Sequence, residues 1–128
     1  MSTGSVVVVT GAAGALGSAL ARYLVGQGRR VVALDRPESQ ERLIALGKEL
    51  GASALLGLEA DLTLASEWAW VMEHISAKFD TPAGAVLAAG GWAGGTPLHA
   101  AADDSAWESM MQSNAETVYR AMRALVPP

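Results

Sequence analysis

Three glycines near the N-terminus have the spacing of a loop that holds phosphate groups. Gly11, Gly14 and Gly17 lie in the segment TGAAGALG (residues 10–17), directly after the apolar run SVVVV. The first glycine allows a tight turn out of a strand, the second leaves room for a diphosphate beside the backbone, and the third lets a helix pack closely. The start of that helix offers free N–H groups and a positive dipole end to the phosphates. For this segment taken alone, a tight strand-to-helix turn without a ligand is the alternative.

A carboxylate follows at the end of the second apolar run. Asp35 lies 18 residues after Gly17. At this position of a dinucleotide-binding unit an acid can accept hydrogen bonds from both hydroxyls of the adenine ribose, and it repels a 2′-phosphate. We therefore expect NAD, as NADH, to be the cofactor and NADP to be less favoured. Arg36 qualifies this expectation, because a guanidinium beside the acid can partly accommodate a phosphate.

Two later segments carry residues suited to the same ligand. Asp61-Leu62-Thr63 follows a third apolar run, where the adenine of a dinucleotide would lie, although Asp61 could instead be an acid at a helix start. The segment AAGGWAGG (residues 88–95) follows a fourth run, and its first glycine pair offers bare backbone to the cofactor ribose. The residues predicted to bind the cofactor are Gly11, Ala13, Gly14, Ala15, Leu16, Gly17, Asp35, Arg36, Asp61, Leu62, Ala89, Gly90 and Gly91.

Short apolar runs alternate with segments of helical periodicity, and these elements must position the residues above. Strands are predicted at 5–10, 30–35, 54–60 and 83–89, and helices at 15–28, 38–50, 64–79 and 104–126. Such alternation predicts an α/β fold, a Rossmann-type doubly wound parallel sheet with right-handed crossovers and strand order 3-2-1-4. Ligands bind beyond the carboxyl ends of such strands, where the strand order reverses. The loops after the first and fourth strands flank that point.

The composition limits the class of protein. The 128 residues are 51% hydrophobic and 17% charged, which fits one folded domain over residues 1–128 and excludes a disordered tail. The net charge of −4, with no basic cluster larger than Arg29-Arg30, argues against nucleic acid binding. There is no cysteine and the two histidines lie far apart, so no metal site is predicted. The absence of a signal-like start or a long apolar stretch leads us to expect a soluble cytoplasmic protein and no membrane partner.

Together these segments resemble a known family over essentially the whole chain. TGAAGALG, Asp35, Asp61-Leu62-Thr63 and the following AAGG resemble the N-terminal half of the short-chain dehydrogenases/reductases. Two features depart from the usual pattern: the middle glycine falls one residue early for TGxxxGxG, and Leu87-Ala88-Ala89-Gly90 stands where Asn-Asn-Ala-Gly is usual. Within the family, AGGWAGG and the pair Gln112-Ser113 are most similar to the dihydropteridine reductases, which use NADH.

The resemblance implies roles for two further residues. Asn114 corresponds to a catalytic-site asparagine that holds a backbone kink and a water of the proton relay; a plain polar helix residue is the alternative. Trp92 would lie at the mouth of the substrate cleft and stack on a flat heterocycle such as a pterin. Packing of Trp92 on its own domain or in a subunit contact is the alternative there.

The family's chemistry also implies residues that the sequence does not contain. It uses a Tyr-x-x-x-Lys pair on a fifth helix, but the only tyrosines are Tyr23 and Tyr119, and Tyr119 is followed four residues later by Arg123. We therefore expect a fold truncated after the fourth strand–helix unit. Such a chain supplies the cofactor-binding half and lacks the acid–base centre, so its own catalytic activity is left open.

Three functions remain open at this point. The leading one is the N-terminal part of an NADH-dependent oxidoreductase that reduces a small molecule, with a pteridine as the candidate substrate. The others are a non-catalytic dinucleotide-binding module, and a short-chain reductase acting on a sugar, acyl or steroid carbonyl. Because the fourth helix helps form the dimer in the family, we also expect a homo-oligomer through this helix, with contacts from Met110, Met111, Val118 and Met122.

Overall fold

Four parallel strands form one sheet in the computed structural model, which describes residues 4–127. The strands are β1 (Val6–Thr10), β2 (Arg30–Asp35), β3 (Leu55–Glu59) and β4 (Gly84–Leu87), and their order in the sheet is β3-β2-β1-β4. All three neighbouring pairs are parallel. The prediction of a doubly wound parallel sheet with order 3-2-1-4 is confirmed.

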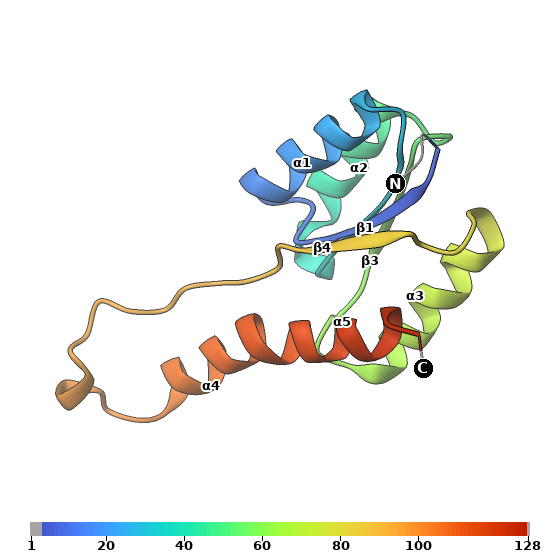
Figure 1. Cartoon of the computed structure of the whole chain (residues 1–128). Coiled ribbons are helices and arrows are strands. Elements are labelled where there is room, and N and C mark those ends of the chain that lie inside the picture. Colours follow the sequence, from blue (N-terminus) through green and yellow to red (C-terminus); the bar gives the residue numbers. More distant parts are fainter. Residues whose placement is uncertain (1–3, 128) are drawn as a thin grey trace.

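Helices cover both faces of this sheet (Figure 1). One layer contains α1 (Ala15–Gly26) and α2 (Gln40–Leu50), and the other contains α3 (Ala65–Lys78) and α5 (Thr117–Leu125). Because successive strand residues point to opposite faces, the β1 run is buried on both sides: Val6 and Val8 belong to one core cluster and Val9 to the other. This two-sided burial explains why the run is continuously apolar rather than alternating.

Several element boundaries differ from the prediction. The second strand is confirmed at its predicted bounds, the third and fourth are shorter, and the first helix ends at Gly26 rather than 28. The second helix is preceded by a short 3-10 turn, η1 (Pro37–Ser39), because proline has no N–H to donate and suits the first helical turn. The long loop after β4 contains another such turn, η2 (Leu98–Ala100).

The predicted fourth helix, 104–126, is not a single α-helix. It consists of α4 (Ser105–Met111), a π-helical segment η3 (Gln112–Glu116) and α5, which follow one another without a break. The loop after β4 runs outward from the body, and α4 leads the chain back to it (Figure 1). Residues 90–109 are accordingly all exposed. Together α4, η3 and α5 form a rod, and its C-terminal part, α5, packs against α3 and the sheet.

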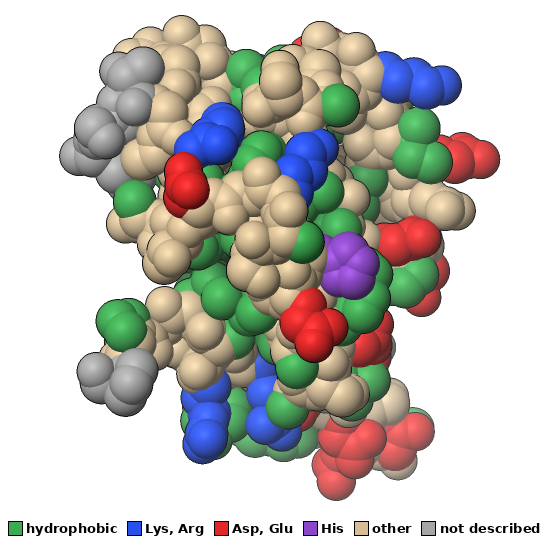
Figure 2. Space-filling view, turned by 90° about the vertical axis from the view of Figure 1, so that its right-hand side faces the viewer, with side chains coloured by type: hydrophobic (Ala, Val, Ile, Leu, Met, Phe, Trp, Pro, Cys, Tyr) green, Lys and Arg blue, Asp and Glu red, His purple; other side chains and the backbone are tan. Residues whose placement is uncertain are grey.

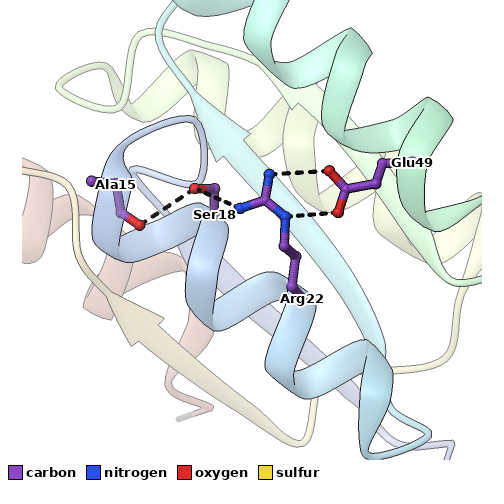
Figure 3. Close-up of polar contacts among 4 residues, drawn as sticks. All are labelled: Ala15, Ser18, Arg22 and Glu49. Atoms are coloured by element: carbon purple, nitrogen blue, oxygen red, sulfur yellow. Dashed lines mark hydrogen bonds and ion pairs between the residues drawn. The ribbon is translucent and has the colours of Figure 1, made fainter.

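An ion pair joins the two helices on the first face of the sheet (Figure 3). The Nε and Nη2 of Arg22 on α1 donate to the two carboxylate oxygens of Glu49 on α2, at 2.7 and 3.1 Å. Ser18 Oγ accepts a longer hydrogen bond from Arg22 Nη1 at 3.4 Å. The hydrogen bond with Arg22 lowers the pKa of the Glu49 carboxyl from its usual value, and the same bond raises the pKa of Arg22.

Charged side chains on the face away from the projecting loop are mixed (Figure 2). Lys and Arg side chains lie there in ones and twos, and acidic side chains gather toward one edge, so this face has no broad basic patch. Within residues 4–127, no three His, Asp or Glu side chains come together as a metal site. No helix in the same range is long and apolar enough to cross a membrane.

Candidate functional site

A cleft of about 400 Å³ lies at the carboxyl ends of the four strands. It is lined from every strand end and from the start of η3. Of the residues predicted to bind a cofactor, the cleft brings together Gly11, Gly14, Asp35, Arg36, Asp61, Leu62, Ala89 and Gly90. Ala13, Ala15, Leu16, Gly17, Gly91 and Trp92 do not line it.

The three glycines of the first loop are required for different structural reasons. Gly11 has φ of +66°, and a Cβ there would lie 2.8 Å from the backbone of Ala88 and Ala89. A Cβ at Gly17 would overlap the Gly11 carbonyl group, so Gly17 allows α1 to pack directly on the loop. Gly14 faces the cleft, and a Cβ there would meet only the Gly11 oxygen, at 3.3 Å. Only Gly14 therefore leaves space on the side where a ligand would enter.

The start of α1 has free backbone donors beside Gly14. Gly14 is the N-cap and provides no side chain to cap the helix. The first helical hydrogen bond runs from Ser18 N–H to Gly14 O, at 2.9 Å. Within the described residues, the N–H groups of Ala15, Leu16 and Gly17 have no protein acceptor. Free N–H groups at the positive end of a helix dipole fit a diphosphate, which supports a dinucleotide at this site.

Asp35 connects the end of β2 to the glycine-rich loop. Its Oδ2 accepts the N–H of Ala13 at 2.9 Å, and its Oδ1 accepts the N–H of Arg36 at 2.8 Å. The Ala13 N–H is thus engaged inside the protein, and a contact of Ala13 with a cofactor stays a prediction. Each carboxylate oxygen retains lone-pair capacity toward the cleft.

Asp61 lies in the turn before α3. Its Oδ1 accepts hydrogen bonds from Thr63 N–H and Thr63 Oγ1, at 3.0 and 2.6 Å, while its own N–H donates to Glu67 at 3.0 Å. Asp61 therefore stabilises the turn before α3 and also lines the cleft. A role at the helix start and a role at the cofactor site are thus compatible for this acid. The Leu62 side chain packs in the core, and the Leu62 carbonyl oxygen accepts the indole N–H of Trp68 at 3.0 Å.

The loop after β4 is held at two points. Buried Thr10 at the end of β1 accepts the N–H of Ala89 on its Oγ1, at 3.1 Å. Asn114, inside η3, accepts the N–H of Gly91 at 3.2 Å and donates to the Gly91 carbonyl oxygen at 2.9 Å. A Cβ at Gly90 would lie 2.7 Å from the Asn114 Oδ1, so this glycine permits the close approach.

Trp92 lies beyond these contacts on the projecting loop. Its side chain is 81% exposed, and a Cβ at Gly94 would meet the indole ring at 2.5 Å. The second glycine pair thus lets the indole lie over its own backbone. Trp92 does not line the cleft at the strand ends, and the loop after β4 runs outward from the body (Figure 1), so the role of Trp92 toward a substrate stays a prediction.

Sequence reasoning did not single out several polar residues that line the cleft. Arg42 in the first turn of α2 and buried Ser39 lie beside Asp35, and Arg42 Nη2 donates to Ser39 Oγ at 3.1 Å. Ser109 and Thr117 line the cleft from the rod formed by α4, η3 and α5. The available signal for Arg42 was its place near the start of the second predicted helix, because the start of that helix must lie near the end of β2.

Comparison with known proteins adds to this geometry. The sequence model of the family described as short chain dehydrogenase matches residues 5–128. Over 122 residues the chain is 32% identical to the NADP-dependent 3-hydroxy acid dehydrogenase YdfG of Salmonella typhi, a match that covers 95% of this chain and 48% of YdfG.

Solved structures with the same fold include the KRED1-Pglu enzyme, at 26% identity and a TM-score of 0.86, with 96% of this chain and 50% of that chain covered. The 3-ketoacyl-(acyl-carrier-protein) reductase of Brucella melitensis, complexed with NADH, is 24% identical with a TM-score of 0.83, over 97% of this chain and 50% of that one.

The chain thus spans about half the length of these relatives. The family match extends over nearly the whole sequence and includes the glycine-rich loop, Asp35 and the loop after β4. The chain belongs to the short-chain dehydrogenase family.

Proposed function

We propose that residues 1–128 bind NAD(P) and act as the cofactor-binding part of an oxidoreductase of the short-chain dehydrogenase type with a small-molecule substrate. The observation that carries this proposal is a cleft lined by both Gly14 and Asp35, with free backbone N–H groups at the start of α1 directly after Gly14. A bound nicotinamide cofactor would supply or accept the hydride.

The protein groups each have a part in holding that cofactor. The start of α1 binds the diphosphate through backbone N–H groups, and Gly14 leaves room for it. Asp35 accepts hydrogen bonds from the adenine ribose with the lone pairs that Ala13 and Arg36 leave free. The backbone of Ala89 and Gly90 borders the other end of the cleft. NADH is the preferred form, because the Asp35 charge opposes a 2′-phosphate.

A glycine pair of variants tests cofactor binding directly. In Gly14→Ala the new methyl group enters the space for the diphosphate, and we expect NADH affinity, measured by titration calorimetry, to fall at least about tenfold. Gly26→Ala is the matched control at the other end of α1, where a Cβ meets nothing within 4 Å. Equal affinity in the two variants, or a wild type that binds no dinucleotide, contradicts the proposal.

We further propose a pteridine as the substrate, with Trp92 as its stacking surface. An indole that is 81% exposed on a loop with two glycine pairs is available to stack on a flat ring. A pterin should then quench the fluorescence of the wild type, and Trp92→Ala should lose that part of the signal and weaken binding. Trp107→Ala is the control, because Trp107 is also exposed, at 67%. Unchanged pterin affinity in Trp92→Ala would leave a sugar, acyl or steroid carbonyl as the substrate class.

A non-catalytic dinucleotide-binding module is the second candidate. It is favoured by one observation: the 128 residues contain no Tyr-x-x-x-Lys sequence to supply the acid and its partner cation. NADH oxidation by the chain is followed with a pterin and with simple carbonyl compounds. Oxidation with any of these compounds contradicts the non-catalytic module, whereas binding without oxidation fits both the module and a cofactor-binding part that lacks the acid–base pair.

A further inference from the structure

A second hollow lies between α3 and α5, which pack against each other on one face of the sheet (Figure 1). This α3–α5 groove has a volume of about 250 Å³, and none of its lining residues lines the cleft at the strand ends. Much of its lining is apolar, from Trp68, Met72, Ala65, Ala69 and Ala124. The groove can therefore hold a ligand of its own, independently of the cleft.

The charged residues that line this groove are Arg120 and Arg123. Their guanidinium carbons lie 5.3 and 5.9 Å from the centre of the Tyr119 ring, so the two cations gather around one side chain. Arg120 Nη2 lies 3.6 Å from a carboxylate oxygen of Glu116, one helical turn earlier. Arg123 forms no ion pair within residues 4–127 and donates to the Tyr119 hydroxyl at 3.3 Å. Two cations against one carboxylate leave an excess of one positive charge, which a monoanion would balance.

Two hydrogen-bond donors at the groove have no acceptor within the described part of the chain. Arg120 Nε is buried without a partner. Ala65, the first residue of α3, lines the groove, and its backbone N–H likewise has no protein acceptor. The acid in that first turn, Glu67, accepts the N–H of Asp61 and does not line the groove. A buried donor without an acceptor carries a desolvation cost, which an anionic ligand would offset.

We infer that the α3–α5 groove binds a small organic anion, a carboxylate with a short apolar tail. Arg120 and Arg123 bind the carboxylate, because the planar donor pattern of a guanidinium matches its two oxygens, and a rotation of the Arg120 guanidinium turns Nε toward the ligand. Trp68 and Met72 cover the tail and remove it from water. The inference goes beyond the proposed function, because it needs neither the cofactor nor any residue that lines the cleft.

Three probe molecules test the two parts of the ligand separately. Binding of hexanoate, acetate and hexan-1-ol to the wild type is measured by titration calorimetry. Acetate has the carboxylate without the tail, and hexan-1-ol has the tail without the charge. We expect hexanoate to bind at least about tenfold more tightly than either of them.

Variants of the two arginines test the carboxylate contact. Arg120→Gln should weaken hexanoate at least about tenfold, and Arg123→Gln, at an exposed position that should not disturb folding, at least about threefold. Lys78→Gln is the matched control, because it removes one positive charge from the last turn of α3 without lining the groove. It should change hexanoate affinity less than about twofold.

A further variant tests the place of the tail. Ala69→Leu keeps both arginines and fills part of the groove, so hexanoate should bind more weakly while acetate affinity stays the same. Because Ala69 is exposed, this variant should fold as the wild type does, which circular dichroism checks. Saturating NADH should leave hexanoate affinity unchanged, because the groove and the cleft share no lining residue.

The outcomes separate this inference from the proposed function. A wild type that does not bind hexanoate, equal affinity for hexanoate and hexan-1-ol, competition between hexanoate and NADH, or full hexanoate affinity in both arginine variants overturns the groove as an anion site. A wild type that shows the expected hexanoate binding but binds no dinucleotide overturns the proposed function alone.

Discussion

At the scale of single residues, the glycines of the two loops beside the cleft differ in what each of them allows. Gly14 faces the cleft, whereas Gly17 faces the backbone of its own loop and Gly90 faces the amide of Asn114. A substitution at Gly14 should therefore change ligand affinity, and one at Gly17 should change the stability of the fold. Binding and packing effects can be separated by measuring both quantities for each variant.

Gly17→Ala should destabilise the protein. The new methyl group overlaps the Gly11 carbonyl, and a backbone neighbour cannot move aside as a flexible side chain would. Overpacking of this kind costs about 1–3 kcal/mol, which urea unfolding followed by circular dichroism would detect. Gly26→Ala, where the methyl group meets nothing, should show no loss of unfolding free energy. Equal stability of the two variants would contradict the packing role of Gly17.

Asn114→Ala should loosen the loop after β4. The substitution removes the two-way hydrogen bonding with Gly91 and the donation to the Met110 carbonyl oxygen at 3.0 Å. We expect faster amide hydrogen exchange at Gly91 and a modest loss of stability, about 0.5–1.5 kcal/mol for an exposed pair of this kind. Gln112→Ala, two residues before Asn114 in the same π-helical segment, is the control. Unchanged exchange at Gly91 would mean that Thr10 alone holds the loop.

At the scale of elements, helix irregularity positions the functional groups. The π-helical segment η3 lies where the rod passes the cleft, and its residues Gln112, Ser113 and Asn114 face the cleft or the loop after β4. An added residue in a helical turn widens it locally, and such segments occur often at functional sites.

The α1–α2 ion pair predicts a pH dependence of stability. Because Arg22 lowers the pKa of Glu49 in the folded protein, this contribution is present above the ordinary glutamate pKa and is lost as the pH falls through the lowered value. Glu49→Gln should therefore lose a small part of its unfolding free energy at neutral pH and none in strong acid. Urea unfolding across this range measures the difference. Glu41→Gln, on the same helix, should show no such pH-dependent loss, since Glu41 forms no ion pair within the described residues.

At the scale of the whole molecule, large apolar side chains remain exposed along the rod and the projecting loop. Met111, Tyr119 and Met122 are among them, with exposed fractions of 43%, 52% and 53%. Val86 on β4 is also partly exposed, at 38%, within the part of the chain that the structure describes. Exposed apolar side chains on a helix, beside a strand that is the edge of the sheet, are of the kind that a second copy of a chain can cover.

We therefore expect a homo-oligomer formed through α4 and α5. Met122→Lys places a charge in the centre of this surface and should shift the protein toward a monomer in sedimentation velocity. Tyr23→Lys, on α1 in the opposite layer and 63% exposed, should leave the assembly unchanged. A wild type that sediments as a monomer at all concentrations, or equal effects of both substitutions, would contradict this interface.

The sequence by itself determined the topology and the positions of the motifs. Apolar runs, helical periodicity and the spacing of Gly11, Gly14 and Gly17 are local patterns, and parallel strands with right-handed crossovers allow few arrangements of them. Only the tertiary structure decided which side chains meet across the cleft. The Ala13–Asp35 and Gly91–Asn114 contacts join residues 22 and 23 positions apart. The outward course of the loop after β4 is likewise visible only in the tertiary structure. Local preferences act over a few residues, whereas these contacts form only when separate elements pack together, and that packing decides which polar groups are already satisfied and which are left for a ligand.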